Sequence, residues 1–193
     1  MCYKRKIPYI IICEGQSEYA YLQELNRFLR NIDFSITFIP KIIGTGHCND
    51  AISKYKQIKK DSPRSSHIYI WVDKDTYMRN NCNYGDNYQK KSSNIPNFLF
   101  SYYNFEDFLV MHLEEKDVLL WQNICQNHNH FTNPIHSEQI ESLIKQNIFS
   151  GYKKGEIPFI ITQKHIDNLL QHQENHDIKF KCDFAKLLSS YNS

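Results

Sequence analysis

Hydrophobic runs and helical periods alternate along the first hundred residues of the chain. Continuous β-branched and aromatic runs are typical of strands covered on both faces, whereas apolar positions three and four residues apart are typical of helices. The pattern predicts strands over residues 7–13, 34–43, 67–72 and 95–102, a helix that begins at Ser17, and a second helix over residues 49–60. Strands and helices that alternate at this spacing predict a mostly parallel sheet with right-handed crossovers, and therefore an α/β fold.

The second half of the chain is dominated by helical periods. They predict helices over residues 104–113, 117–126, 137–148, 162–173 and 183–191, with one further short strand over 158–161. Residues 78–93 are rich in Asn, Tyr and Lys and are predicted to form a surface excursion. No Gly/Ser linker divides the chain, so we expect one globular unit, with an α/β core over residues 1–113 and a helical extension over 114–193 packed on it.

Composition narrows the classes of protein that remain. A chain of 193 residues is long enough for one domain, and 23 Lys and Arg against 21 Asp and Glu exclude a polybasic coat for nucleic acid. The six cysteines form no C-x-x-C pair, which indicates reduced thiols and a cytoplasmic protein. The apolar run at residues 9–13 is too short for a signal peptide, and no run approaches the roughly 18 apolar residues of a membrane span.

Acidic side chains follow two of the predicted strands. Glu14 comes directly after the first strand, with Glu18 one helical turn later, and Asp73 and Asp75 follow the third strand. Ligands of open parallel sheets bind beyond the carboxyl ends of the strands, so we expect these acids to converge. Converging carboxylates raise one another's pKa unless a cation neutralises them, and an all-oxygen ligand set favours Mg²⁺ or Mn²⁺. The sequence therefore predicts a metal site at this edge of the sheet.

These motifs carry a resemblance to known proteins. A strand ending in EGxxE and a later strand ending in DxD resemble the Toprim fold of topoisomerases, primases and OLD-family nucleases. A closer resemblance is to the RloB-like family, short Toprim proteins encoded beside restriction or abortive-infection loci. Ser101, Phe105-Glu106 and His112-Leu113 resemble that family's S-x-x-x-F-E-x-W-x-x-x-H-F stretch, and residues 151–154, GYKK, resemble its Y-x-K stretch.

The resemblance implies a function and a set of site residues. It implies a Toprim-like catalytic core, a Mg²⁺-dependent nuclease that acts on DNA or RNA, tRNA included, in phage defence, and an ABC/SMC-like ATPase partner that controls it. No G-x-x-x-x-G-K-[ST] motif is present, so ATP dependence would come from that partner. The implied catalytic residues are Glu14, Asp73 and Asp75, and the implied metal ligands are Glu14, Glu18, Asp73, Asp75 and Glu106.

Basic and aromatic residues are candidates for substrate contacts. Lys74 and Lys154 are expected to contact substrate phosphates, whereas the lysines of the helix at 49–60 are expected to form a solvated face. Tyr77, Tyr84 and Tyr88 in the polar excursion could stack on unpaired bases, although a surface loop would show the same composition.

Histidines suggest two further interpretations. His112 shares a helical face with apolar residues, so we expect a hydrogen-bonded histidine at the edge of the core. Cys125, His128, His130 and His136 include potential zinc ligands, but their spacing matches no familiar zinc module and their neighbours favour a polar loop.

The alternative to an enzyme is a Toprim-like adaptor that binds nucleic acid or an ATPase without cleavage. The acids at the strand ends argue against it, because a non-catalytic protein has no use for carboxylates that repel one another.

Overall fold

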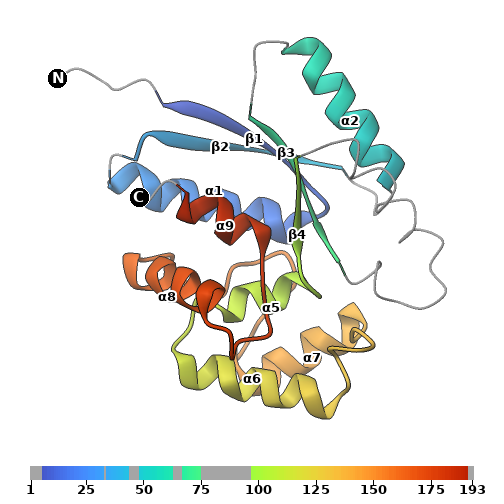
Figure 1. Cartoon of the computed structure of the whole chain (residues 1–193), viewed down its shortest axis with the longest axis vertical. Helices are drawn as coiled ribbons and strands as arrows, with labels where there is room; N and C mark the ends of the chain where they lie inside the picture. The colour runs from blue at the N-terminus through green and yellow to red at the C-terminus, as the bar shows by residue number, and fades with distance from the viewer. Residues whose placement is uncertain (1–5, 33, 44–47, 63–66, 75–96, 191–193) are drawn as a thin grey trace.

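The computed structural model describes residues 6–32, 34–43, 48–62, 67–74 and 97–190. Its centre is a four-stranded sheet in the order β2-β1-β3-β4, and every neighbouring pair is parallel (Figure 1). The strands are β1 (Ile7–Cys13), β2 (Ile36–Ile42), β3 (Ile68–Asp73) and β4 (Phe98–Ser101). The predicted α/β class and the parallel sheet are confirmed.

Helices cover both faces of the sheet. Helices α1 (Gln16–Asn31) and α9 (Asp183–Ser189) lie on one face, and α2 (Cys48–Asp61) lies on the other (Figure 1). Alternation along β1 directs Ile11 toward the core beneath α1, and Ile12 toward a smaller core beneath α2. Because both faces of the sheet are covered, β1 and β3 are apolar over most of their length, as the sequence pattern predicted. The edge strand β2 contains Thr37 and Lys41 and has exposed positions.

The remaining helices form a group beside the sheet. They are α5 (Phe105–Val110), α6 (Glu115–Asn127), α7 (Ser137–Asn147) and α8 (Gln163–Glu174). After α8 the chain returns to the sheet, where Cys182 forms an antiparallel bridge with Ser101 and the Tyr102 N–H donates to the Lys181 carbonyl at 2.9 Å. One buried apolar cluster extends from β1 and α1 to α9, so the two halves share a core.

The expected strand over residues 158–161 is wrong. Residues 157–162 have no regular secondary structure, and their apolar side chains differ in exposure to solvent. Ile161 is buried, whereas Ile160 is 77% exposed. Pro158 also lacks the N–H that a ladder requires. The excursion at 78–93, with its tyrosines, lies outside the described residues, and no described helix has the length and apolarity needed to cross a membrane.

His112 is hydrogen-bonded as expected, but it lies inside the core and not at its edge. The ring is fully buried, Tyr21 Oη lies 2.9 Å from Nε2, and Nδ1 lies 3.0 Å from the Phe108 carbonyl. A carbonyl only accepts, so Nδ1 carries the proton and Nε2 accepts from the tyrosine. Burial lowers the pKa of His112 to about 3, so the ring is a neutral structural group near neutral pH.

Candidate active site

The sheet topology creates a crevice at the carboxyl ends of β1 and β3. β2 pairs with one edge of β1, and β3 pairs with the other edge. The strand order therefore reverses at β1, and open α/β sheets bind ligands at such a point. Glu14 follows β1 directly, and Asp73 is the last residue of β3. The Asp73 backbone N–H donates to Glu14 Oε2 at 3.0 Å. This hydrogen bond fixes the Glu14 carboxylate between the two strand ends.

A cavity of about 450 Å³ opens at this crevice. Helix α1 begins on one side of it, α5 begins on another, and a segment between α7 and α8 completes it. The lining residues are Glu14, Gly15, Gln16, Ser17, Glu18, Asp73, Phe105, Glu106, Lys154 and Gly155. The structure therefore brings together four of the five predicted acids, while Asp75 lies outside the described residues.

Glu18 is a buried acid in the first turn of α1. Its side chain is 4% exposed, and Oε2 accepts a hydrogen bond from the Gly15 N–H at 3.0 Å. This bond satisfies one of the N–H groups that a helix start leaves without a partner in the helix. Burial raises the pKa of Glu18, while the backbone N–H groups and the charge of Lys154 act against that rise.

Glu106 is the second residue of α5 and points into the same cavity. It is 4% exposed, and the Tyr152 hydroxyl donates to its Oε1 at 3.2 Å. Burial raises the pKa of Glu106 to about 7, and the charge of Asp107 adds to the rise. The Glu106 backbone N–H, the charge of Lys154 and the hydrogen bond from Tyr152 act against it. Two of the four cavity acids therefore resist ionisation when no cation is present.

The donor set suits a hard divalent cation. Glu14, Glu18, Asp73 and Glu106 offer carboxylate oxygens without nitrogen or sulfur, the ligand type of Mg²⁺ and Mn²⁺. Within the described part of the chain, no three of these acids bring ligand atoms within 4.8 Å of one another. The carboxyl groups therefore line the cavity at separate positions, and a bound cation would offset the cost of ionising them.

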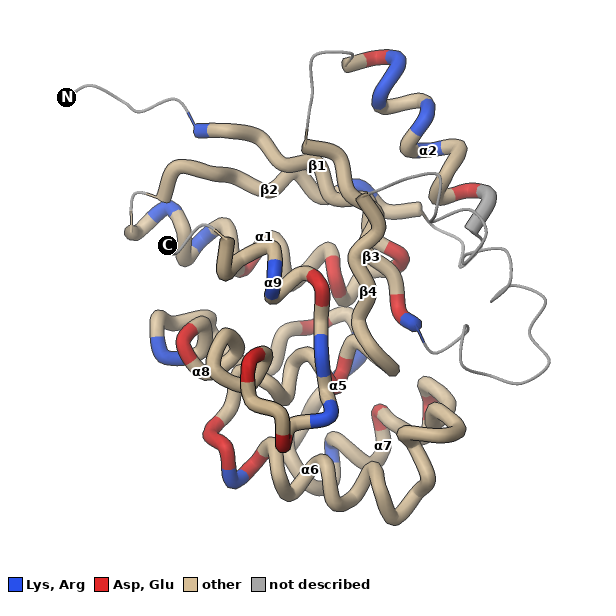
Figure 2. The backbone as a smooth tube through the Cα atoms, in the orientation of Figure 1, with Lys and Arg blue, Asp and Glu red and all other residues tan. Residues whose placement is uncertain are grey.

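The two predicted phosphate contacts lie in different places. Lys154 lines the cavity, and its Nζ donates to Ser137 Oγ at 2.6 Å. Lys74 lies over the ring of Tyr102, with Nζ 4.3 Å from the centroid, and does not line the cavity. The basic positions of α2 lie across the sheet from α5 (Figure 2). Of the predicted basic contacts, Lys154 is the one placed to meet a phosphate in the cavity.

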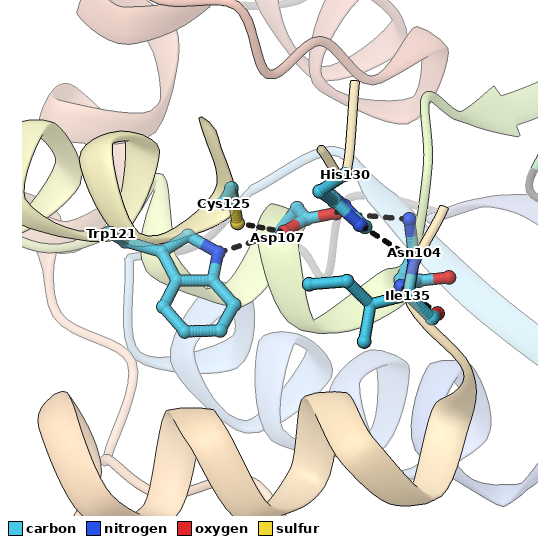
Figure 3. A network of polar contacts seen from close by, with 6 residues as sticks. All are labelled: Asn104, Asp107, Trp121, Cys125, His130 and Ile135. Carbon is cyan, nitrogen blue, oxygen red and sulfur yellow. Dashed lines mark hydrogen bonds and ion pairs between the residues drawn. The ribbon is translucent and has the colours of Figure 1, made fainter. Parts of the chain in front are cut away.

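A second polar cluster lies next to Glu106 in sequence but faces α6 and the loop that precedes α7. Asp107 is buried and accepts from Trp121 Nε1–H at 2.7 Å and from the Asn104 N–H at 3.0 Å (Figure 3). The Cys125 thiol lies 4.0 Å from Oδ1, and His130 Nε2 lies 2.8 Å from Oδ2. These donors join α5 to α6 and to the loop that precedes α7.

Asp107, Cys125 and His130 form the one group of three potential metal ligands within 4.8 Å among the described residues. The Ile135 N–H donates to His130 Nδ1 at 2.9 Å, so Nε2 must carry the ring proton that is shared with Asp107. No ring lone pair is then left for a metal, and both carboxylate oxygens already accept hydrogen bonds. We therefore interpret the cluster as a structural network.

The structure confirms the polar-loop interpretation for residues 128–136 in part. Cys125 lies in α6, and both Cys125 and His130 are fully buried, whereas His128 and His136 are exposed. One part of the network could have been predicted from the sequence. Asp107 follows Asn104 by three residues, which is the spacing of a helix-capping pair. The sequence did not show that the same carboxylate would reach residues up to 23 positions away.

Comparison with known proteins places the chain in a family. A family model described as "RloB-like protein" matches residues 9–186. The chain belongs to the RloB-like family. No curated protein and no solved structure gives a significant match. The RloB-like match includes both strand ends that carry the cavity acids and the segment that carries Tyr152 and Lys154.

Proposed function

We propose that this RloB-like chain is a Mg²⁺-dependent Toprim nuclease that hydrolyses phosphodiester bonds in DNA or RNA. The observation that supports this most strongly is the cavity at the ends of β1 and β3, which four acidic residues and one lysine line. Carboxylates suit a divalent cation, and a lysine suits a phosphate. The carboxylates and the lysine lie together where the strand order reverses, at the ends of β1 and β3. This combination favours phosphoryl chemistry over binding alone.

The residues divide the work by position. Glu14, fixed by the Asp73 N–H, is the general base or acid beside the reacting oxygen. Asp73, Glu18 and Glu106, together with Asp75, would hold Mg²⁺ or Mn²⁺. When bound, the cation stabilises the charge that develops on the phosphate and lowers the pKa of an attacking water. Lys154, which lines the same cavity, orients a substrate phosphate.

The regulatory context is part of the proposal. The 193 residues contain no P-loop motif, so they supply no ATP-driven step of that kind themselves. An ABC/SMC-like ATPase is the partner that the family resemblance implies, and phage defence is the setting. An assay of the isolated chain therefore needs a parallel assay with the ATPase encoded nearby.

The experiment compares cleavage by the parent protein and by Glu14→Gln and Asp73→Asn. Panels of single- and double-stranded DNA, rRNA and tRNA are incubated with Mg²⁺, Mn²⁺ or EDTA. We expect metal-dependent cleavage by the parent and a loss of at least about 100-fold in each variant, as for removal of a catalytic acid–base group. Lys56→Gln, on the opposite face of the sheet, is the matched control. Equal activity in the parent and both variants would refute the proposed site, and Mn²⁺ binding without any cleavage would favour the adaptor.

A further inference from the structure

The segment between α7 and α8 reaches the cavity from the C-terminal half of the chain. Tyr152 lies within it and is 2% exposed, and its ring lies against that of Phe149 with centroids 6.3 Å apart. The hydroxyl donates to Glu106 Oε1 at 3.2 Å, across 46 residues of sequence. Among the residues that form the site, Tyr152 had no role assigned from the sequence.

The backbone of this segment is fixed at both ends. The Phe149 N–H donates to the Ile144 carbonyl at 2.8 Å, which ties the start of the segment to α7. The Gly155 N–H donates to Ser17 Oγ at 3.2 Å, which ties its end to the first turn of α1. Gly155 has φ +86, a left-handed conformation that glycine adopts without strain. The hydroxyl of Tyr152 is therefore held in place by contacts that do not involve Glu106.

The hydrogen bond restrains the Glu106 carboxylate at the cavity. A hydroxyl that donates to Oε1 restricts rotation of the carboxylate of this cavity-lining residue. Groups that orient a ligand in this way commonly change metal affinity by about 10- to 100-fold when they are removed. The anchored position of Tyr152 is what such a role requires.

We propose that Tyr152 is a positioning residue that orients the Glu106 carboxylate for cation binding. This inference rests on the proposed metal-dependent function. It makes the segment at residues 149–156 a structural part of the metal centre, contributed by the helical half of the chain.

The test measures Mn²⁺ affinity by calorimetry on the metal-free full chain. Tyr152→Phe removes only the hydroxyl, and Tyr55→Phe removes a hydroxyl from a buried tyrosine of α2 on the other face of the sheet. We expect the Kd for Mn²⁺ to rise about 10-fold in Tyr152→Phe and to stay unchanged in Tyr55→Phe. Thermal unfolding in EDTA separates the two effects, since a purely structural tyrosine would lower the midpoint and leave the Kd unchanged.

A double-mutant cycle with Glu106→Gln assigns the effect to this pair. We expect Tyr152→Phe to change the Kd in the parent but not in the Glu106→Gln background. An equal effect in both backgrounds, or an unchanged Kd in Tyr152→Phe, would overturn the inference while Mn²⁺ binding by the parent would still support the proposed function. A parent that binds no Mn²⁺ would refute both.

Discussion

A single residue, Glu106, lowers the stability of the folded protein when its side chain ionises. The pKa of Glu106 is about 7 in the folded protein, and its ordinary value is 4.5. The stability that depends on the neutral carboxyl is therefore fully present below pH 4.5 and is lost as the pH rises through 7. The shift corresponds to about 3 kcal/mol at pH 8. The carboxylate that the proposed chemistry needs is thus one that destabilises the metal-free protein.

Glu106→Gln is expected to stabilise the metal-free chain at pH 8 by up to about 3 kcal/mol, with most of that gain absent at pH 5. The glutamine oxygen can still accept from Tyr152, whereas its neutral amide carries no charge to desolvate. Urea unfolding at both pH values in EDTA measures the difference. Glu156→Gln, at an exposed position, serves as the control. A gain of equal size at both pH values would contradict the assigned cause.

For Asp107, the residue next to Glu106, we expect the amide substitution to destabilise the protein. Its carboxylate accepts from Trp121, His130 and the Asn104 N–H, and a buried donor without an acceptor costs about 1–3 kcal/mol. Asp107→Asn replaces one acceptor by an NH₂ group that faces these donors, so we expect a loss of about 3 kcal/mol or more in urea unfolding.

Asp177→Asn, at an exposed position, is the matched control for that loss. A zinc site at Asp107, Cys125 and His130 would give a different result. Native mass spectrometry would then find one zinc per chain, and a chelator would destabilise the parent protein as much as the substitution does. The hydrogen-bond network predicts neither.

At the scale of elements, the sequence predicted what local patterns determine. Buried strands and amphipathic helices follow from apolar runs and periods, and Glu14 and Asp73 are located by the strands that precede them. The motif at residues 151–154 indicated Lys154 as a phosphate contact, but it did not predict the hydrogen bond from Tyr152 to Glu106. That contact depends on how the segment after α7 is anchored to α1, more than 130 residues away. The false strand at 158–161 had the same origin, since an apolar run becomes a strand only where a neighbouring edge is available.

Helix α5 shows how one element serves two purposes. Its first turn carries Glu106 toward the cavity and Asp107 toward α6, so the network around Asp107 also fixes the direction of Glu106. The sequence identified Glu106 through its family resemblance and did not identify Asp107, because adjacent acids at a helix start look alike until their partners are known. Orientation, and not residue type, separates the acid that lines the cavity from the acid of the structural network.

The whole molecule depends on a core that both halves build. Phe184 of α9 stacks on Trp71 of β3 with centroids 4.3 Å apart, and it also contacts Tyr21 and Phe108. Full burial of such a side chain contributes about 1.5–3 kcal/mol, while a domain has about 5–15 kcal/mol in total. The boundary predicted after residue 113 therefore separates two sequence patterns that a single core joins.

A chain truncated after residue 113 is consequently expected to lose cooperative unfolding. The truncation removes α6 to α9, so the apolar face of α1 and the ring of Trp71 would meet water, and Glu106 would lose its hydrogen bond from Tyr152. Thermal unfolding followed by circular dichroism should show a broad, non-cooperative change, against a single transition in the full chain. Amide dispersion in a proton–nitrogen correlation spectrum provides a second measurement. A sharp transition together with dispersed amides in residues 1–113 would show instead that the α/β half folds alone, and that the helical half is an addition to a finished core.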